Sequence, residues 1–339
     1  MAGVNHRYIL RAHGDEGITA ELFALEEAPV PEPGPGQCLI KVLWLSVDPA
    51  MRGWISTWPN YRDPVALGSV MVGFTVGQVL ASRHPDYPVG CFVLGRQGWQ
   101  EWALSDGSDI DRRLDPDQAP LTAHLHVLGH TGLTAYLGLM RVGQPMPGET
   151  VVVSTAAGAV GSTVGQIAKL KGCRTVGITG APDKIASCLK DFGYDAALDY
   201  KAEPDLPAAL GRACPAGIDV YFDNVGGEIS DAVMQHLNVG ARVVICGTLG
   251  ILDGETALGP RVNRQLLVKR ARMEGFLILD HLDHAEAARA ELAQWYQAGK
   301  LRAREEVVDG LAQAPEALMR LLRGDNRGKM LVRVGAPAD

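Results

Sequence analysis

The sequence predicts an α/β protein in which a doubly wound parallel sheet is joined to a second, β-rich domain of barrel type. Two observations carry this prediction. From residue 150 onward, short apolar segments alternate with segments of helical periodicity, which is the pattern of parallel strands connected by helices. Before residue 123, short strand-like segments are divided by Gly and Pro, which is typical of small β-barrels.

The parallel sheet is expected to begin with a strand, a turn, a helix and a second strand over residues 150–180. Residues 151–153 are three valines, and a short β-branched run suits a strand that is buried on both faces. Apolar residues then recur at helical spacing until Gly172, and residues 175–179 form the next strand-like run. The turn between strand and helix consists of small residues, Ala156-Ala157-Gly158-Ala159-Val160-Gly161.

This turn predicts a dinucleotide-binding site. In a unit of this kind, a tight turn lets the backbone approach a pyrophosphate, which binds to the unpaired N–H groups at the start of the helix. A glycine-rich turn alone is a weak signal, and the strand and helix around it make the prediction more specific. The turn residues that we expect at the cofactor are Ala157, Gly158, Val160 and Gly161.

The end of the second strand indicates which dinucleotide binds. Sites that prefer NAD place an acidic residue there, about 20 residues after the turn, to accept a hydrogen bond from the ribose. This chain has Thr179 and Gly180 at that place, and the next acid, Asp183, is followed by Lys184. Because no carboxylate repels a 2′-phosphate and Lys184 supplies a cation for it, these residues predict NADPH. Taken alone, Lys184 is also compatible with a solvated helix lysine.

The composition narrows the function classes. The chain has 339 residues, of which 47% are hydrophobic, and a net charge of −7. The negative charge argues against nucleic acid or an anionic membrane surface as a partner. The N-terminal residues lack the apolar core of a signal peptide and no run of about 18 apolar residues occurs, so we expect a cytoplasmic protein without a membrane segment. The six scattered cysteines favour reduced thiols over disulfides or a zinc lobe.

The remaining elements continue the same patterns. Further strands are predicted at residues 8–12, 18–24, 39–46, 67–82, 196–198, 219–227 (running into a glycine turn), 241–247, 272–279, 303–308 and 329–334. Helices are predicted at residues 128–139, 183–192, 204–213, 228–237, 261–269, 284–298 and 315–322. The C-terminal tail is expected to pack on the N-terminal domain. This gives a discontinuous domain, 1–124 and 302–339, and a continuous one, 125–301.

Several motifs along nearly the whole chain are longer than chance motifs: Ser46-Val-Asp-Pro49, Leu133-Thr-Ala-Tyr136, the turn at 156–161, Tyr221-Phe-Asp-Asn-Val-Gly-Gly227 and Gly324-Asp-Asn-Arg-Gly-Lys329. With them the chain resembles the zinc-free branch of the medium-chain dehydrogenase/reductase superfamily. That branch includes prostaglandin reductases, leukotriene 12-hydroxydehydrogenase and bacterial curcumin reductases. The resemblance implies a Rossmann domain that binds NADPH, a GroES-like substrate domain and a homodimer formed through the Rossmann domains. It also implies reduction of the carbon–carbon double bond of an α,β-unsaturated ketone or aldehyde.

The resemblance also assigns roles to single residues. Tyr200 matches the family tyrosine that closes over the 2′-phosphate. Asn326 matches an asparagine near the nicotinamide, and its alternative role is to form a turn before Gly328. The other expected cofactor contacts, through backbone and amide groups at strand ends on the cofactor side of the sheet, are Asn224, Cys246 and Gly247.

Enone reduction requires a hydrogen-bond donor for the carbonyl oxygen, where negative charge develops, and a proton for the α-carbon. The family usually places a tyrosine in Ser-x-Tyr-Asn, but the aligned stretch here is Gly250-Ile-Leu252-Asp253, so the tyrosine position is Leu252. A metal cluster of His124, His126 and His130 is disfavoured because no paired carboxylate or thiolate accompanies these histidines, and we expect no metal.

Two residues are candidates for the missing donor. Tyr61 matches a tyrosine of bacterial curcumin-reductase-like members, and His130 can donate or relay a proton at neutral pH. The plainer interpretations are a loop aromatic and a helix-start histidine. Trp54 and Trp58 suggest that the small carbonyl substrate is largely apolar. A quinone reductase, an alcohol or carbonyl dehydrogenase and, last, a non-enzymatic NADPH-binding protein remain as alternatives.

Overall fold

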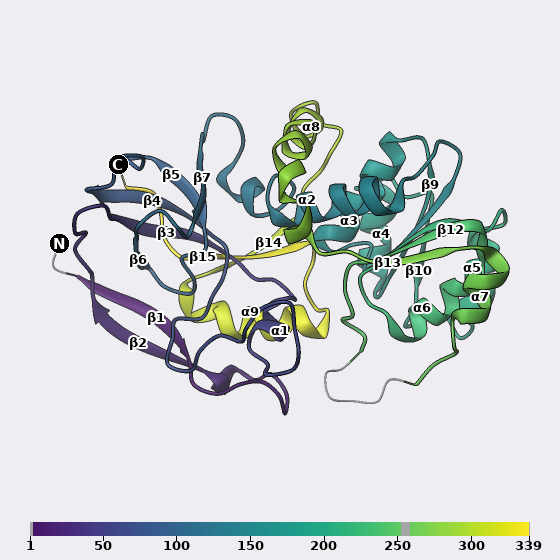
Figure 1. Cartoon of the computed structure of the whole chain (residues 1–339), viewed down its shortest axis with the longest axis horizontal. Helices are drawn as coiled ribbons and strands as arrows, with labels where there is room; N and C mark the ends of the chain where they lie inside the picture. Colours follow the sequence, from purple (N-terminus) through teal and green to yellow (C-terminus); the bar gives the residue numbers. More distant parts are fainter. Residues whose placement is uncertain (1–2, 252–257, 339) are drawn as a thin grey trace. The chain divides into compact units, whose positions relative to one another are not determined.

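The computed structural model describes residues 3–251 and 258–338. The chain divides into two compact units, and Figure 1 shows their elements. One unit comprises Met1–Leu125 and Glu305–Asp339, and the other comprises His126–Arg304. They are called the discontinuous unit and the continuous unit below, and each is described by itself.

The continuous unit is built on a parallel sheet with the strand order β10-β9-β8-β11-β12-β13. The chain starts in the middle of this sheet, adds strands on one side, returns to the middle and then adds strands on the other side. This arrangement confirms the predicted doubly wound sheet. The strands are β8 (Thr150–Ser154), β9 (Arg174–Thr179), β10 (Ala196–Asp199), β11 (Ile218–Asp223), β12 (Leu237–Ile245) and β13 (Arg272–Gly275).

Helices connect these strands, and α3 and α6 lie on opposite faces of the sheet (Figure 1). The three valines of β8 are completely buried, as expected for a strand that is covered on both faces. The helices are α2 (His130–Leu137), α3 (Ala159–Leu170), α4 (Pro182–Lys190), α5 (Leu206–Ala213), α6 (Gly227–Met234), α7 (Asn263–Lys269) and α8 (Ala285–Gln297). A π-helical segment, Gly138–Gly143, continues α2, and a 3₁₀ segment, Ile278–His284, precedes α8.

The discontinuous unit is β-rich, as predicted. Its larger sheet has the order β14-β15-β3-β4-β5-β7, with β6 paired to β3, and β1 and β2 form a separate antiparallel pair. Its strands are β1 (Val4–Leu10), β2 (Phe23–Pro29), β3 (Cys38–Ser46), β4 (Thr75–Ser82), β5 (Phe92–Gly95), β6 (Trp102–Ser105), β7 (Ile110–Leu114), β14 (Glu305–Asp309) and β15 (Lys329–Arg333). Its helices are α1 (Met51–Trp54) and α9 (Ala314–Arg323), with 3₁₀ turns at Ala20–Leu22, Leu121–Leu125 and Leu311–Gln313. The C-terminal strands are part of the larger sheet because β15 pairs with β3.

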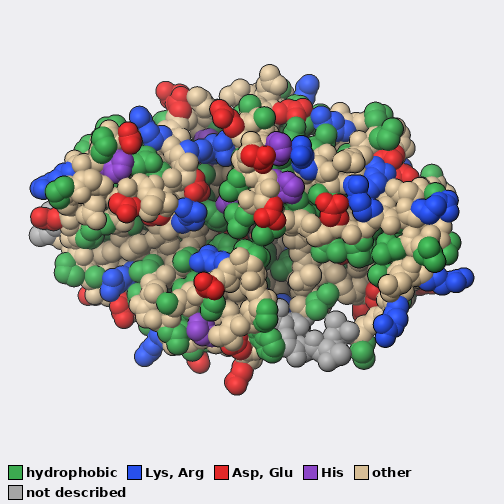
Figure 2. Space-filling model, in the orientation of Figure 1, with side chains coloured by type: hydrophobic (Ala, Val, Ile, Leu, Met, Phe, Trp, Pro, Cys, Tyr) green, Lys and Arg blue, Asp and Glu red, His purple; other side chains and the backbone are tan. Residues whose placement is uncertain are grey.

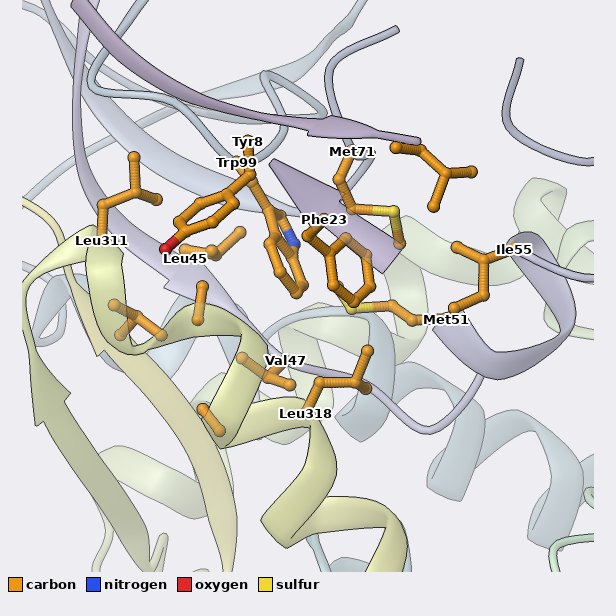
Figure 3. Packing of buried hydrophobic residues seen from close by; sticks show 14 of the residues in the cluster. Tyr8, Phe23, Leu45, Val47, Met51, Ile55, Met71, Trp99, Leu311 and Leu318 are labelled. Atoms are coloured by element: carbon orange, nitrogen blue, oxygen red, sulfur yellow. The ribbon is translucent and has the colours of Figure 1, made fainter. Parts of the chain in front are cut away.

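A buried aromatic cluster is the core of the discontinuous unit (Figure 3). Trp99 is completely buried, the ring of Phe23 stacks on it at 4.9 Å, and Tyr8 meets it edge-on at 6.1 Å. Met51 and Ile55, on and directly after α1, point into the same cluster. The packing of these two side chains therefore anchors the chain segment on either side of Trp54.

Three predicted strands are partly wrong. Of the strand segment expected at 67–82, only Thr75–Ser82 is a strand, β4. The strand expected at 18–24 is β2, Phe23–Pro29, which includes exposed glutamates and ends on a proline that propensity places outside strands. Both strands of a two-stranded sheet are edge strands, and an edge strand tolerates exposed glutamates and a terminal proline. The pairing of Phe23 with Leu10 sets the register. The strand expected at 272–279 ends at Gly275, because Phe276 makes the last backbone hydrogen bond to the neighbouring strand and the chain then turns into a 3₁₀ segment.

Candidate cofactor-binding and catalytic site

The turn after β8 brings together the four turn residues predicted at the cofactor. Gly158 is the N-cap of α3 and no side chain caps this helix, so no capping side chain occupies the anion-binding end of its N–H groups. Residues 158–160 are partly exposed, whereas Ala157 and Gly161 are buried. The start of α3 is therefore accessible to a ligand, and its unpaired N–H groups suit a pyrophosphate.

Close packing explains the glycine at 161. A Cβ atom there would collide with the carbonyl oxygen of Thr155 and lie 2.9 Å from the Cα atom of Ala156. Thr155 itself has a positive φ of 53°, an uncommon conformation for a β-branched residue. The turn is therefore tight enough that only a glycine fits between it and the helix.

Tyr194 packs against this turn and stabilises it, a role that was not anticipated from the sequence. Its hydroxyl donates a 2.7 Å hydrogen bond to the carbonyl oxygen of Gly161, and its ring fills the space where Gly165 has no side chain. Burial raises the pKa of the Tyr194 hydroxyl well above its ordinary value, which keeps it protonated as a donor. A tyrosine after a helix is an ordinary core residue in sequence, so no signal marked this role.

The end of β9 meets the residues that follow β10. Thr179 is buried, and its carbonyl oxygen accepts a 3.1 Å hydrogen bond from the backbone of Tyr200. A Cβ atom on Gly180 would lie 3.1 Å from the Tyr200 ring and 3.1 Å from the Lys201 side chain. Gly180 therefore lies under Tyr200 and Lys201. The structure brings Thr179, Gly180 and Tyr200 together, and it adds Lys201, which the sequence analysis had not assigned.

Lys184 lies in the first turns of α4 and is partly exposed. The structure also places an acidic residue, Asp199, at this edge of the sheet. The sequence analysis did not connect Asp199 with the end of β9 because the two are far apart along the chain. The Asp199 carboxylate oxygens accept hydrogen bonds from the backbone N–H groups of Ala181, at 3.1 Å, and Lys201, at 3.0 Å. Asp199 thus links the residue before α4, which carries Lys184, to the segment after β10, which carries Lys201.

The carboxyl ends of β8, β11 and β12 form a second group of expected residues. Asn224 donates from its backbone to Ser154 Oγ at 2.8 Å and from its side chain to the Ser154 carbonyl oxygen at 2.7 Å. Cys246 and Gly247 both donate from their backbones to the carbonyl oxygen of Asp223, at 2.8 and 3.1 Å. The predicted residues Asn224, Cys246 and Gly247 are therefore neighbours, held by backbone bonds across the sheet.

Asp223 organises this edge and was missed from the sequence. Its Oδ1 atom accepts from the Tyr221 hydroxyl at 2.9 Å and from the backbone of Val225 and Gly226, each at 2.9 Å. Burial, together with the nearby Asp223 charge, raises the pKa of the Cys246 thiol to about 12, so this cysteine is no nucleophile at neutral pH. The Tyr-x-Asp-Asn spacing of the motif at 221–227 is the signal that marks Asp223 in retrospect.

Asn326 lies in the discontinuous unit, in the loop before β15. It is buried, and its side-chain amide donates a 2.7 Å hydrogen bond to the Gly328 carbonyl oxygen, which is the turn-forming role named as its alternative. The loop is anchored by Lys329, which is 2% exposed and donates from Nζ to Asp48 Oδ1 and to the Val47 carbonyl oxygen, both at 2.8 Å.

Tyr61 lies in the loop after α1, and its side chain is 49% exposed. Its hydroxyl oxygen accepts a 2.8 Å hydrogen bond from Trp54 Nε1. The hydroxyl of the expected donor is thus held in place rather than left to rotate freely.

His130 is the first residue of α2, in the continuous unit, and is partly exposed. The neighbouring His126 is completely buried and belongs to the same unit, whereas His124 belongs to the other and lies 3.1 Å from an Arg112 nitrogen. Across residues 3–251 and 258–338, no group of three or more His, Cys, Asp or Glu side chains could hold a metal ion. The predicted substitution at Leu252 lies outside the residues that the structure describes.

These residues suit two groups of NADPH, its pyrophosphate and the phosphate on its adenosine ribose. The uncapped helix start at Gly158 suits the pyrophosphate. The aromatic ring and lysines around Gly180 suit a phosphate on the adenosine ribose.

Two family models match the chain. One, described as the N-terminal domain of oxidoreductase, matches residues 6–112, and one described as zinc-binding dehydrogenase matches residues 159–295.

Relatives match along nearly the whole chain. The NADPH-dependent curcumin reductase of Escherichia coli (strain K12) is 44% identical over 337 residues, which covers 97% of each chain. Prostaglandin reductase 1 of Oryctolagus cuniculus is 38% identical over 95% of this chain and 91% of its own. The crystal structure of CurA in complex with NADPH from Vibrio vulnificus superimposes with a TM-score of 0.92 at 42% identity, covering 98% of this chain and 100% of that one. The chain belongs to the medium-chain dehydrogenase/reductase superfamily, in its zinc-free branch of curcumin and prostaglandin reductases.

Proposed function

We propose that this protein is an NADPH-dependent oxidoreductase that reduces the carbon–carbon double bond of small, largely apolar α,β-unsaturated ketones or aldehydes. The observation that carries the proposal is the group formed by Gly180, Tyr200 and Lys201 at the end of β9. It offers a cation and an aromatic ring where an NAD site would offer a carboxylate. The activities named for the curcumin and prostaglandin reductases supply the substrate class.

The residues of the continuous unit would bind and orient the dinucleotide. The start of α3 would bind the pyrophosphate, and Lys184, Tyr200 and Lys201 would bind the 2′-phosphate. Asn224, Cys246 and Gly247 would contribute backbone and amide contacts at the strand ends. Asn326, which belongs to the discontinuous unit, would contribute its amide near the nicotinamide. When bound, the reduced nicotinamide supplies the hydride.

Tyr61 and His130 are the residues proposed to act on the substrate. Tyr61 would donate a hydrogen bond to the carbonyl oxygen as negative charge develops there. His130 would supply or relay the proton that reaches the α-carbon. We also propose that the two compact units correspond to the predicted substrate and cofactor domains.

An assay of the purified protein tests this function. The expected result is loss of NADPH absorbance with an enone, together with a product that has gained two hydrogens and kept its carbonyl group, identified by mass spectrometry and infrared absorption. Turnover with a quinone but no enone would favour the quinone reductase. A product alcohol would favour a carbonyl dehydrogenase, and NADPH binding without turnover on any acceptor would favour a non-enzymatic protein.

We further propose that two copies associate through their parallel sheets. Strand β13 is the outer strand of the described sheet, and Arg272, Glu274 and Gly275 on it are exposed. The adjacent helix α7 exposes Leu267 to 77%. Figure 2 shows basic and apolar side chains side by side at the end of the continuous unit that carries α5 and α7.

The charge pattern of β13 favours a second copy as the occupant of this edge. An antiparallel pairing of two β13 strands centred on Met273 would set Arg272 of each copy opposite Glu274 of the other. The measurement is the mass in solution by light scattering, where a dimer is expected. A Met273→Pro variant, which removes a backbone donor from the edge and cannot continue the pairing, should shift the protein to monomer.

The expected compartment is the cytoplasm. All six cysteines are free thiols. Burial raises the pKa of Cys38, Cys173 and Cys214 to about 11. Among the described residues, no helix combines the length and the apolar character needed to cross a bilayer. Free thiols are the usual state in a reducing compartment, which supports this proposal.

A further inference from the structure

A closed loop presents Tyr61 on the surface of the discontinuous unit. The backbone of Val65 donates a 2.8 Å hydrogen bond to the Trp54 carbonyl oxygen, so residues 54–65 begin and end at the same point. Asp15 holds the near side of the loop, because its carboxylate accepts 2.7 Å hydrogen bonds from the Ser56 hydroxyl and from both the backbone and the hydroxyl of Thr57. The loop is therefore exposed but tied at its base.

The far side of the loop folds back on α1. The Asn60 side chain lies against Gly53, where a Cβ atom would collide with it, and the Asn60 Oδ1 atom accepts a 2.8 Å hydrogen bond from the Tyr61 backbone. Asn60 therefore holds the far side of the loop, next to Tyr61, against α1.

Trp54 is the rigid end of this arrangement. It is 7% exposed, its ring lies edge-on to Phe74 at 6.2 Å, and the Arg62 guanidinium lies 5.2 Å from the ring centre. Met51 and Ile55, on either side of it, are completely buried in the aromatic cluster (Figure 3). The indole therefore has one fixed position, and its N–H group points at the Tyr61 hydroxyl.

The direction of this hydrogen bond has a chemical consequence. An indole nitrogen only donates, so the Tyr61 oxygen must be the acceptor, and the Tyr61 hydrogen is directed elsewhere. A hydroxyl that accepts one hydrogen bond also becomes a stronger donor in the next, because the two bonds polarise one another.

We propose that Trp54 is a positioning residue for the reduction: its N–H group orients the Tyr61 hydroxyl and strengthens it as the donor to the substrate carbonyl oxygen. The inference rests on the proposed function. Tyr61 touches the reacting carbonyl in this scheme, whereas Trp54 acts only through Tyr61.

The test is a double-mutant cycle on kcat with NADPH and a reducible enone. Trp54→Phe keeps an aromatic ring and removes the N–H group, so kcat should fall about threefold to tenfold, the range that one net hydrogen bond provides. In the Tyr61→Phe background, which lacks the hydroxyl, the same change should leave kcat unaltered. The Kd for NADPH should be the same in all four proteins, because none of the changes touches the residues proposed to bind it.

Trp44→Phe is the matched control. Trp44 is a partly buried tryptophan of the same unit with the Arg333 guanidinium 5.2 Å from its ring centre, and it lies outside the loop. If Trp54→Phe does not fold, β-(3-benzothienyl)alanine at position 54 replaces the N–H group with sulfur in a ring of nearly the same shape, and the same loss is expected.

Three results would overturn the inference. The first is an equal loss of kcat whether or not the protein also carries Tyr61→Phe, which indicates a merely structural role. The second is a loss no larger than that of Trp44→Phe, and the third is a Tyr61→Phe protein with normal kcat. Failure of the unmodified protein to reduce any enone refutes the proposed function itself. An active unmodified protein with an unaffected Trp54→Phe variant refutes only the role of Trp54.

Discussion

The turn after β8 and the loop at 54–65 present their functional groups in opposite ways. The turn offers backbone N–H groups, and its shape depends on the absence of side-chain volume at Gly161. The loop offers a side-chain hydroxyl, and its shape depends on polar contacts among Trp54, Asn60 and Asp15. The first site should therefore be sensitive to added atoms, and the second to lost polar atoms. The four predictions below test that difference, from the largest expected effect to the smallest.

Gly161→Ala should have the largest effect, because the added methyl group collides with the Thr155 carbonyl oxygen and the turn must move. Overpacking of this kind costs about 1–3 kcal/mol of unfolding free energy, and we expect the Kd for NADPH to rise about 100-fold or more. Urea unfolding and a fluorescence titration with NADPH measure the two effects. Gly211→Ala, in the last turn of α5, is the control, since its Cβ would meet only the His236 ring, at 3.3 and 3.8 Å. A Gly161→Ala protein that binds NADPH normally would contradict the steric account of the turn.

Tyr61→Phe should lower kcat about 100-fold with little change in the Kd for NADPH, since removal of one donor to a developing oxyanion costs that order of rate. His130→Ala should lower kcat by a smaller factor, because a proton can also arrive from water. Steady-state kinetics with an enone, at saturating NADPH, provide the measurement. Near-normal turnover in both variants would refute the hypothesis that these two residues replace the family tyrosine.

Lys201→Ala should weaken NADPH about tenfold and leave NADH unchanged, because a charge-assisted hydrogen bond to the 2′-phosphate is lost and NADH has no such phosphate. Lys184→Ala should act in the same direction. Lys190→Ala, at the other end of α4, is the matched control. Equal losses for the two dinucleotides would show that the lysines support the fold rather than recognise the phosphate.

Tyr194→Phe should have the smallest effect on the turn. The ring would still fill the space beside Gly165, but the carbonyl oxygen of Gly161 would lose its hydrogen bond from a buried hydroxyl, which lowers the unfolding free energy by about 1 kcal/mol. Urea unfolding checks the value, with Tyr87→Phe on the other unit as the control. A loss as large as that of Gly161→Ala would mean that the hydroxyl, and not the missing side-chain volume, holds the turn.

Much of the continuous unit could be predicted because its signals are local. Buried parallel strands must be apolar along their whole length, and the helices that cover them must place an apolar residue at every third or fourth position. The strand of Val151, Val152 and Val153 and the helix after it could therefore be predicted from these patterns. The turn between them needs small residues for steric reasons, so Gly158 and Gly161 could be recognised from the sequence alone. The strand and helix boundaries were then accurate to within a few residues.

The discontinuous unit was harder because its pairings are not local. The hairpin of β1 and β2 lies at residues that propensity disfavours; Phe23 pairs with Leu10 in this hairpin and stacks on Trp99, far along the chain. Long-range packing overrides local preference in such cases. The same limit applied to Lys201, Asp199 and Tyr194, whose roles depend on neighbours that are distant in sequence.

By itself the sequence determined the fold class and membership of the zinc-free reductases, and it predicted the position of the dinucleotide turn and the preference for NADPH. These properties follow from residue size, apolar periodicity and the absence of a carboxylate at one strand end, all of which are visible along the chain. Only the tertiary structure decided which polar atoms meet, the Trp54 indole with the Tyr61 hydroxyl and the Tyr194 hydroxyl with the Gly161 carbonyl oxygen, and that the Lys201 side chain packs beside Gly180. A hydrogen bond depends on distances of a few tenths of an ångström, and these distances are set by packing across the whole unit.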